Sequence, residues 1–146
     1  MIALIQRVIQ ANVLVDNKEI GSIQGGLLVL LGVEKGDGQV QAQRLVERIL
    51  GYRVFEDEQG KMNLSLKDTQ GELLLVPQFT LAANTDKGMR PSFSSAAAPD
   101  EGRFWFEQVV ELARQSLPVV EIGQFGADMK VGLVNDGPVT FWLQTH

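Results

Sequence analysis

The longest apolar stretch of the sequence is Leu27-Leu28-Val29-Leu30-Leu31-Gly32-Val33, which follows Gly25-Gly26 and precedes Lys35-Gly36-Asp37-Gly38. A continuous apolar run of this length, without polar alternation, is typical of a β-strand that is buried on both faces. The glycine-rich segments on either side indicate turns. The stretch therefore predicts one fully buried strand over residues 27–33.

Other segments also favour strands. Branched residues at the start of the chain, followed by Asp16-Asn17-Lys18 as a turn, predict a hairpin. Pro77 lies in the middle of another expected strand, and since proline has no N–H group, this strand must be bulged, bent or at an edge there. Gly137-Pro138 is expected to form the turn between the last two strands. Apart from the buried strand, the expected strands cover residues 2–9, 13–15, 19–23, 52–55, 72–81, 119–125, 129–135 and 139–144.

Two segments have the periodicity of amphipathic helices. Within residues 40–50, apolar residues recur at three- and four-residue spacing, at Ala42, Leu45, Val46 and Ile49. A second helix is expected over residues 100–116, after Pro99, and Pro118 ends it. About eight strands and two helices, without strict alternation, predict an α+β fold in which the helices cover a curved sheet or open barrel.

Length and composition indicate a single domain over residues 1–146. A chain of this length buries most of its apolar surface without disulfides or metals. With 45% hydrophobic and 21% charged residues, a globular fold is favoured over a disordered or fibrous one. No apolar run approaches the roughly 20 residues of a membrane span, and the start of the chain is strand-like, so we expect a cytoplasmic protein with no membrane partner.

The residue types restrict the chemistry. The chain has no cysteine, and its one histidine, His146, is the last residue, where a frayed terminus is a simpler interpretation than a ligand or base. Ser-His-Asp and Cys-His mechanisms are therefore excluded. Hydrolysis would need a Thr, Ser or carboxylate side chain, backbone N–H groups or groups of the substrate. The net charge of −5 argues against a general nucleic-acid coat protein but is compatible with local basic patches.

The segment Pro77-Gln78-Phe79-Thr80-Leu81 is the first candidate site. It is either an ordinary strand end or a place where a bend at Pro77 turns the N–H groups of Phe79 and Thr80 towards a substrate oxygen. In the second case Gln78 and the Thr80 hydroxyl lie beside these groups. The loop that follows, residues 82–98, is long for a connection, and long ordered loops are often functional.

The segment Asn135-Asp136-Gly137-Pro138-Val139-Thr140 is the second candidate site. It is either a hairpin turn or a rigid element that presents backbone carbonyls to a ligand. X-Pro bonds are cis in only about 5 to 6% of cases in folded proteins, so the residues alone favour a trans bond. The residues leave both interpretations open.

The chain resembles the D-aminoacyl-tRNA deacylase (D-tyrosyl-tRNA(Tyr) deacylase) family over essentially its whole length. Many segments match the family in the same order and at the same spacing, so the agreement is not explained by chance. They are Ala3-Leu4-Ile5-Gln6-Arg7-Val8, Gly26-Leu27-Leu28-Val29-Leu30-Leu31-Gly32-Val33, Arg53-Val54-Phe55-Glu56-Asp57, Gly60-Lys61-Met62-Asn63-Leu64-Ser65, Gln78-Phe79-Thr80-Leu81, Lys87-Gly88, Arg90-Pro91-Ser92-Phe93, Phe125-Gly126-Ala127-Asp128-Met129 and Asn135-Asp136-Gly137-Pro138-Val139-Thr140.

The resemblance implies two packed β layers with two helices on one side, and a homodimer in which the turn at Gly137-Pro138, with a cis bond, reaches into the partner's active site. There its carbonyls meet the α-amino region of the substrate and exclude the side chain of an L-amino acid, whereas glycine passes. Arg7 would hold the turn from the facing subunit, and Met129 would also contact the substrate. The alternative for Arg7 is a surface strand arginine.

The reaction implied is hydrolysis of the ester between a D-amino acid and the terminal adenosine of tRNA, and also of glycyl-tRNA mischarged on tRNA(Ala). Gln78, Phe79 and Thr80 are the implied catalytic residues, and no metal or cofactor is needed. Either the Thr80 hydroxyl attacks or a ribose hydroxyl of the substrate assists a water; without a histidine we favour the second. Lys87 and Arg90 would contact the acceptor stem, unless they are ordinary solvated loop charges.

One position departs from the family: Pro77 stands where a serine is usual, so any duty of that serine is in doubt here. Three other functions remain to be distinguished. They are a hydrolase of free small esters or peptides with Thr80 as nucleophile, a non-catalytic RNA-binding or dimer-scaffold module, and an editing domain for L-aminoacyl-tRNA. The net negative charge disfavours the RNA-binding module, and Gly137-Pro138, which would exclude L side chains, disfavours the editing domain for L-aminoacyl-tRNA.

Overall fold

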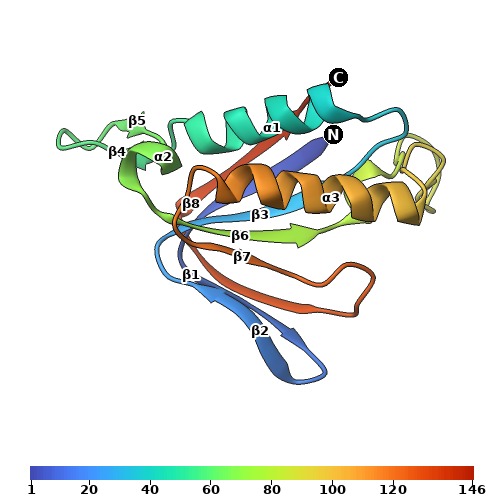
Figure 1. The fold of residues 1–146 in the computed structure, drawn as a ribbon, viewed down its shortest axis with the longest axis horizontal. Helices are drawn as coiled ribbons and strands as arrows, with labels where there is room; N and C mark the ends of the chain where they lie inside the picture. Colours follow the sequence, from blue (N-terminus) through green and yellow to red (C-terminus); the bar gives the residue numbers. More distant parts are fainter.

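The apolar stretch forms β3 (Gly26–Gly32), which lies inside a curved six-stranded sheet (Figure 1). The computed structural model describes residues 1–146. β3 pairs antiparallel with β1 (Ile2–Val15) on one side and parallel with β6 (Glu72–Pro77) on the other. The sheet has the order β2-β1-β3-β6-β7, and β8 adds to the free edge of β1. The predicted central strand is confirmed.

The curvature of the sheet originates in β1. Its first half pairs with β3, and its second half pairs along the same edge with β2 (Lys18–Ile23). The other edge of β1 pairs with β8 (Lys130–Gln144). Because β2 continues the edge that β3 occupies, the sheet curls until β2 lies against β6 and β7 (Val120–Ile122) and forms a nearly closed barrel. The predicted turn between β1 and β2 is confirmed, since Asp16 and Asn17 both have positive φ.

The two faces of β3 bury their side chains in two different cores. Leu27, Val29 and Leu31 belong to the larger core, between the sheet and the helices, whereas Leu28 belongs to a smaller core inside the curl. An interior strand with a core on each face needs apolar residues at successive positions, which accounts for its uninterrupted apolar sequence.

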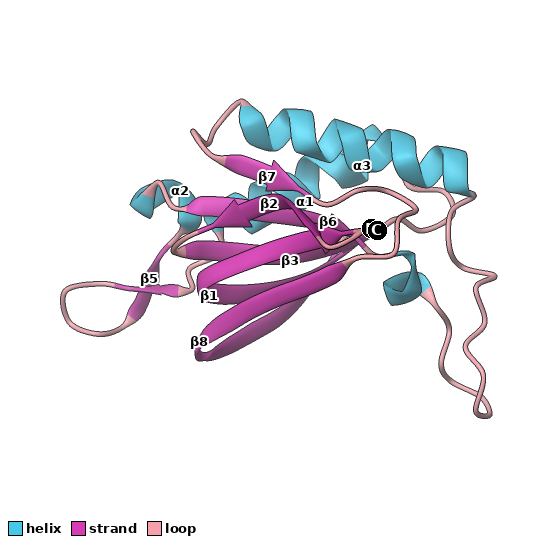
Figure 2. Cartoon of the chain, turned by 90° about the horizontal axis from the view of Figure 1, so that it is seen from below, coloured by secondary structure: helices cyan, strands magenta, loops and turns pink.

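The helices α1 (Gln39–Gly51) and α3 (Pro99–Arg114) cover one side of the sheet, as Figures 1 and 2 show. Both bury the apolar face that their periodicity predicted. In α3, Pro99 occupies the first turn, where its missing N–H group costs no hydrogen bond. The expected α+β class with a curved sheet and helices on one side is confirmed. None of the helices is long and apolar enough to cross a membrane.

The region between α1 and β6 differs from the prediction. The strand expected over residues 52–55 is only β4 (Phe55–Glu56), which pairs with β5 (Met62–Leu64). Tyr52 instead caps α1, because its N–H group bonds to the Arg48 carbonyl. An unpredicted short helix, α2 (Leu66–Thr69), follows, and its capping box of Ser65 and Asp68 was the signal in the sequence.

Pro77 ends its strand rather than lying in the middle of it. β6 stops at Pro77, and residues 79–82 form a 3-10 helix, η1 (Phe79–Ala82), where the prediction had strand. The next N–H group, of Gln78, still donates to the Leu31 carbonyl at 2.8 Å, but the chain then leaves the ladder. The predicted break of the ladder near residue 77 is confirmed. The prediction that the strand continues to residue 81 was wrong.

Gly137-Pro138 does not form a hairpin turn. Residues 130–144 are one strand, β8, and both of its halves pair with β1. Asn135 lies opposite Val8 and Thr140 lies opposite Gln6, so four residues of β8 face the single residue between them. The prediction of two strands joined by a turn was wrong because β1 continues past this point as a partner for both halves. Residues 135–140 form a large bulge, called the Gly-Pro bulge below.

Gly26 is required where β3 starts beside β6. A Cβ atom at this position would lie 1.8 Å from the Glu72 carbonyl oxygen, a backbone atom, whereas a Cβ on Gly25 would meet nothing within 4 Å. We therefore predict that Gly26→Ala lowers the free energy of unfolding by about 3 kcal/mol, as overpacking against backbone does. Gly25→Ala, the matched control, should change it by less than about 0.5 kcal/mol. Urea unfolding of both variants measures this, and equal losses would contradict the contact.

Candidate active site

Gln78, Phe79 and Thr80, called the η1 site below, lie where β6 gives way to η1. The hydrogen bonds of η1 begin with the Leu81 N–H group, which donates to the Gln78 carbonyl at 3.3 Å. The N–H groups of Phe79 and Thr80 precede this bond, so neither the β ladder nor the helix uses them. Two adjacent N–H donors at the start of a helical turn can hold the negative oxygen of a reacting carbonyl.

The side chains of the η1 site face solvent. Phe79 and Thr80 are exposed, and Gln78 is half-buried. The Gln78 amide donates a hydrogen bond to the Thr80 hydroxyl. An amide is not a base, so this contact orients the hydroxyl without activating it. The Phe79 ring lies 5.2 Å from the ring of Phe93, which comes from the long loop.

An apolar cavity of about 240 Å³ opens beside the η1 site. The end of β3, the start of α3 and the segment around Phe125 form its walls. Gly102 of α3 keeps this space open, since a Cβ there would lie 3.3 Å from the Phe125 ring. The lining residues are Leu31, Val33, Pro77, Gln78, Phe79, Ala97, Pro99, Gly102, Phe106, Phe125 and Gly126.

The Gly-Pro bulge is held at its base and exposed at its tip. Asn135 accepts a hydrogen bond from the Val139 N–H group at 2.7 Å and donates one to the Thr140 hydroxyl at 2.9 Å. Gly137 and Pro138 at the tip are exposed. The bond between them is cis, as the family resemblance implied.

Arg7 joins the bulge to the rest of its own chain. Its guanidinium donates to the Asp136 carbonyl at 3.0 Å and to the Val54 carbonyl at 2.7 Å, and the residue is only 7% exposed. The sequence predicted that Arg7 would hold the bulge of a facing subunit, whereas the structure places this contact within one chain. The reason is the register of β1 and β8, which sets position 7 opposite the bulge. The alternative of a surface arginine is wrong.

The η1 site and the Gly-Pro bulge do not meet within one chain. Pro77 pairs with Leu31, and Leu31 pairs with Ala3, whereas the bulge lies opposite Arg7, four residues further along β1. Four strand residues span about 13 Å, and the three strand spacings from β6 to β8 add about 14 Å across the sheet, so the separation is roughly 19 Å.

The sequence of the whole chain matches one family. A family model described as D-Tyr-tRNA(Tyr) deacylase matches residues 4–144. The chain belongs to this deacylase family. A protein of Photorhabdus laumondii subsp. laumondii, named D-aminoacyl-tRNA deacylase, is 64% identical over 99% of both chains. One of the same name from Thioalkalivibrio sulfidiphilus is 62% identical, over 99% of this chain and 97% of that protein.

Solved structures show the same fold. A structure described as c-Myc DNA Unwinding Element Binding Protein has a TM-score of 0.96 and 39% identity, and the match covers 100% of this chain and 99% of that one. A structure of a probable eukaryotic D-amino acid tRNA deacylase has a TM-score of 0.81, with 99% of this chain and 98% of that one covered. Its 18% identity supports the fold alone. The deacylase resemblance stated from the sequence is confirmed at the level of family and fold.

Of the other predicted site residues of this deacylase family member, Met129 lies near Pro77, because a Cβ on Gly123 would lie 2.9 Å from the Met129 sulfur and 3.3 Å from Pro77 Cδ. Met129 is half-buried against the core inside the curl, where its sulfur accepts the Gln124 N–H group at 3.4 Å. Lys87 and Arg90 are exposed on the long loop and form no ion pair. No group of three or more His, Cys, Asp or Glu side chains gathers as a metal site.

The sequence missed two features of the deacylase chain. The Val54 carbonyl that accepts from Arg7 is a backbone group, and no residue pattern marks it. The cavity was missed because its walls come from segments far apart in the sequence, although Gly102 inside an otherwise regular helix was a signal of close packing.

Arg7 should contribute to stability through its two carbonyl contacts. We predict that Arg7→Met lowers the free energy of unfolding by about 1 to 3 kcal/mol, since the buried Val54 carbonyl loses its donor. Arg53→Met is the matched control: Arg53 is exposed, and its bond to Asn63 at 3.1 Å lies at the surface. Arg53→Met should change the free energy of unfolding by less than about 0.5 kcal/mol. Urea denaturation compares the two, and a similar loss for both would contradict the role of Arg7.

Proposed function

We propose that this chain hydrolyses the ester that joins a D-amino acid to the terminal adenosine of tRNA, releasing the free amino acid and tRNA. Its family membership and its relatives named D-aminoacyl-tRNA deacylase support this substrate. The observation that carries the chemistry is the pair of unused N–H groups of Phe79 and Thr80 at the mouth of an apolar cavity. The cavity and the two N–H groups together suit a substrate that has a flat base close to a reacting carbonyl.

The cavity suits the adenine base at the 3′ end of the substrate. Its walls are mostly apolar and aromatic, and stacking between such walls is how proteins hold a base without a paired strand. With the base between Gly102 and Phe79, the ribose and its ester lie next to Thr80. Lys87 and Arg90 on the adjoining loop then meet phosphates of the acceptor stem.

In the proposed reaction, water attacks the ester carbonyl and forms a tetrahedral intermediate. The N–H groups of Phe79 and Thr80 hold its negative oxygen. A neighbouring ribose hydroxyl assists the water; as the intermediate collapses, the carbon–oxygen bond to the ribose breaks and the ribose oxygen takes a proton. Thr80 is not the nucleophile in this mechanism, because its hydroxyl contacts only the Gln78 amide, which cannot remove a proton.

The proposed active enzyme is a homodimer formed along β8. β8 has 15 residues and pairs only with β1, so one edge of a long strand is free. Leu133, Val134, Phe141 and Trp142 on it are exposed although they are large and apolar. A long apolar edge strand is the kind of surface that a second chain covers.

The dimer would bring the two candidate sites together. Within one chain they are roughly 19 Å apart by strand geometry, so the aminoacyl ester of one substrate cannot contact both. We propose that Gly137 and Pro138 of one subunit complete the η1 site of the other, where their carbonyls face the α-amino region of the substrate and Met129 lines the same region. The side chain of an L-amino acid would meet this backbone, whereas glycine has no side chain to exclude, so glycyl-tRNA mischarged on tRNA(Ala) is also a substrate. The enzyme acts in the cytoplasm, where charged tRNA is used, and needs no cofactor.

The function is tested by comparing hydrolysis of D-aminoacyl-tRNA, the matched L-aminoacyl-tRNA and glycyl-tRNA. We predict that the D and glycyl esters are cleaved and that the L ester is not. If the ribose hydroxyl assists, Thr80→Ala should keep kcat/KM within about tenfold of the wild-type value. Removing an attacking nucleophile would lower kcat/KM by far more. Gln78→Ala, measured in the same assay, removes the amide that orients the Thr80 hydroxyl. Cleavage of small esters without tRNA, or of no charged tRNA at all, would overturn the proposal.

The dimer is tested by placing a charge on its proposed surface. We predict that Val134→Lys gives a monomer and lowers kcat/KM for D-aminoacyl-tRNA by at least tenfold, since a buried unpaired charge opposes association. Val40→Lys is the control, because Val40 is also an exposed apolar residue, 71% accessible, but lies on α1. Sedimentation equilibrium gives the mass of each variant. A wild-type monomer with full activity would refute this arrangement.

A further inference from the structure

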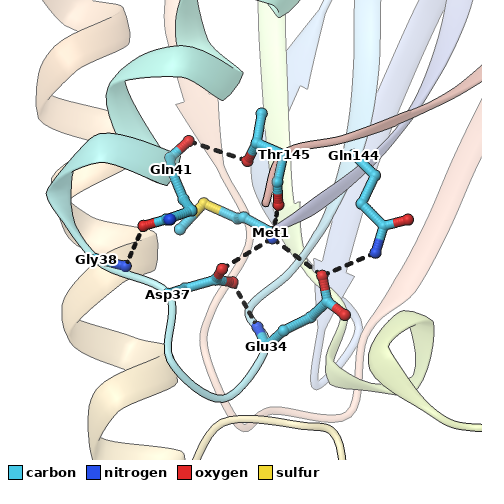
Figure 3. Close-up of polar contacts among 7 residues, drawn as sticks. All are labelled: Met1, Glu34, Asp37, Gly38, Gln41, Gln144 and Thr145. Atoms are coloured by element: carbon cyan, nitrogen blue, oxygen red, sulfur yellow. Dashed lines mark hydrogen bonds and ion pairs between the residues drawn. The ribbon is translucent and has the colours of Figure 1, made fainter.

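The α-amino group of Met1 lies in a partly buried cluster of polar groups (Figure 3). Met1 is 0% exposed. Its ammonium donates to a Glu34 carboxylate oxygen at 3.0 Å, to an Asp37 carboxylate oxygen at 3.0 Å and to the Thr145 carbonyl at 2.8 Å. An ammonium has three protons, and each has an acceptor here. We call Met1, Glu34, Asp37, Gln144 and Thr145 the N-terminal cluster.

The acceptors are themselves held in place. The second oxygen of Asp37 accepts the Glu34 N–H group at 2.7 Å, and the Gln144 amide donates to Glu34 at 3.0 Å. The Thr145 N–H group donates to the Met1 carbonyl at 2.9 Å. The cluster therefore joins the first residue of the chain, the loop after β3 and the residues at the end of β8 (Figure 3).

The same loop forms part of the wall of the cavity beside the η1 site. The Lys35 N–H group donates to the Ser95 carbonyl at 3.0 Å, and the Ala97 N–H group donates to the Val33 carbonyl at 3.0 Å. Val33 and Ala97 both line the cavity. Glu34 lies between these two contacts and forms a β-bridge with Ala96. The Met1 ammonium donates to the side chain of this same residue.

Blocking the amino group would remove what this arrangement needs. A formyl or acetyl group converts the ammonium into an uncharged amide with one N–H group, so at most one of the three acceptors keeps its donor. The carboxylates of Glu34 and Asp37, whose side chains are 25% and 7% exposed, would then lose the cation that lies between them, which is unfavourable for partly buried charges. A residue added before Met1 has the same effect, because its own ammonium lies about 3.8 Å further along the chain.

We propose that the α-amino group of Met1 is a modification-sensitive site that positions the cavity wall: it must be unblocked for the loop at residues 33–37 to hold Val33 and Ala97 in place. Where synthesis leaves a formyl group on Met1, a hydrolytic deformylation must precede the formation of the cluster. Water adds to the formyl carbon, the carbon–nitrogen bond breaks, formate leaves and the amine takes up a proton. The link to substrate binding rests on the proposed function, whereas the link to the loop does not.

Three forms of the full chain test the proposal: one with a free Met1, one acetylated at Met1 and one with a glycine before Met1. We predict that both altered forms unfold about 4 °C or more below the free form. Hydrogen exchange should speed up at the amides of residues 33–37 and 95–97. The KM for D-aminoacyl-tRNA should rise at least about threefold, with little change in kcat, because the cluster contacts the loop that forms the cavity wall and makes no contact with Phe79 or Thr80.

A matched background keeps the test specific. In a Glu34→Gln, Asp37→Asn variant the ammonium has no carboxylate partner, so acetylation should have little further effect on the melting temperature. Equal melting temperatures for the free and acetylated forms of the natural chain would overturn the proposal. A lower melting temperature with unchanged exchange at residues 33–37 and 95–97 would overturn the positioning role. If no form cleaves charged tRNA, the proposed function fails, while melting and exchange still decide the role of the amino group.

The acid dependence of stability gives a second readout. Burial disfavours the charge on Glu34, but the hydrogen bond from Gln144 and the Met1 ammonium outweigh it, with a smaller effect of His146, and keep the pKa of the Glu34 carboxyl below its usual value. A lowered pKa in the folded state adds stability at neutral pH, which is lost as the pH falls through that pKa. Asp37 is the other carboxylate that faces the ammonium. The free form should therefore lose stability below about pH 4 more steeply than Glu34→Gln.

Discussion

The hydrogen-bond ladder of β1 is the interaction on which the rest of the structure depends. Along one edge it pairs with β3 and then with β2, and along the other it pairs with β8. This double use of one strand curls the sheet and so encloses the smaller core. It also sets Arg7 opposite the Gly-Pro bulge and brings Met1 next to Thr145. A change of register by one residue would exchange the two faces of β1 and disrupt all of these contacts together.

The second constraint is chemical. A chain without cysteine and with its one histidine at the last position cannot use the imidazole base or the thiolate on which Ser-His-Asp and Cys-His hydrolases depend. Backbone N–H groups can stabilise a negative oxygen, and they do so only where secondary structure leaves them without partners. Pro77 ends β6 at such a place, and the next two residues after Gln78 begin η1 with free donors. The residue that departs from the family pattern is thus compatible with the proposed oxyanion site.

Local patterns predicted the elements whose stability is local. The buried strand at residues 27–33 and the two helices around residues 40–50 and 100–116 have periodicities that act within a few residues, and the structure confirms them. The errors occurred at residues 52–55, beyond Pro77, and at Gly137-Pro138. At each of these the conformation follows from a neighbouring element: the end of α1, the turn into η1, and the continued pairing of β8 with β1.

The sequence by itself determined the family, the fold class and the two segments of interest, because these depend on residue types and on their order along the chain. Only the tertiary structure decided which groups meet. It placed Arg7 on the bulge of its own chain, opened the cavity beside Phe79 and enclosed the amino group of Met1 between Glu34, Asp37 and Thr145. The physical reason is sequence distance: these contacts join residues as far apart as positions 1 and 145, and strand register and helix packing set them, not local propensity.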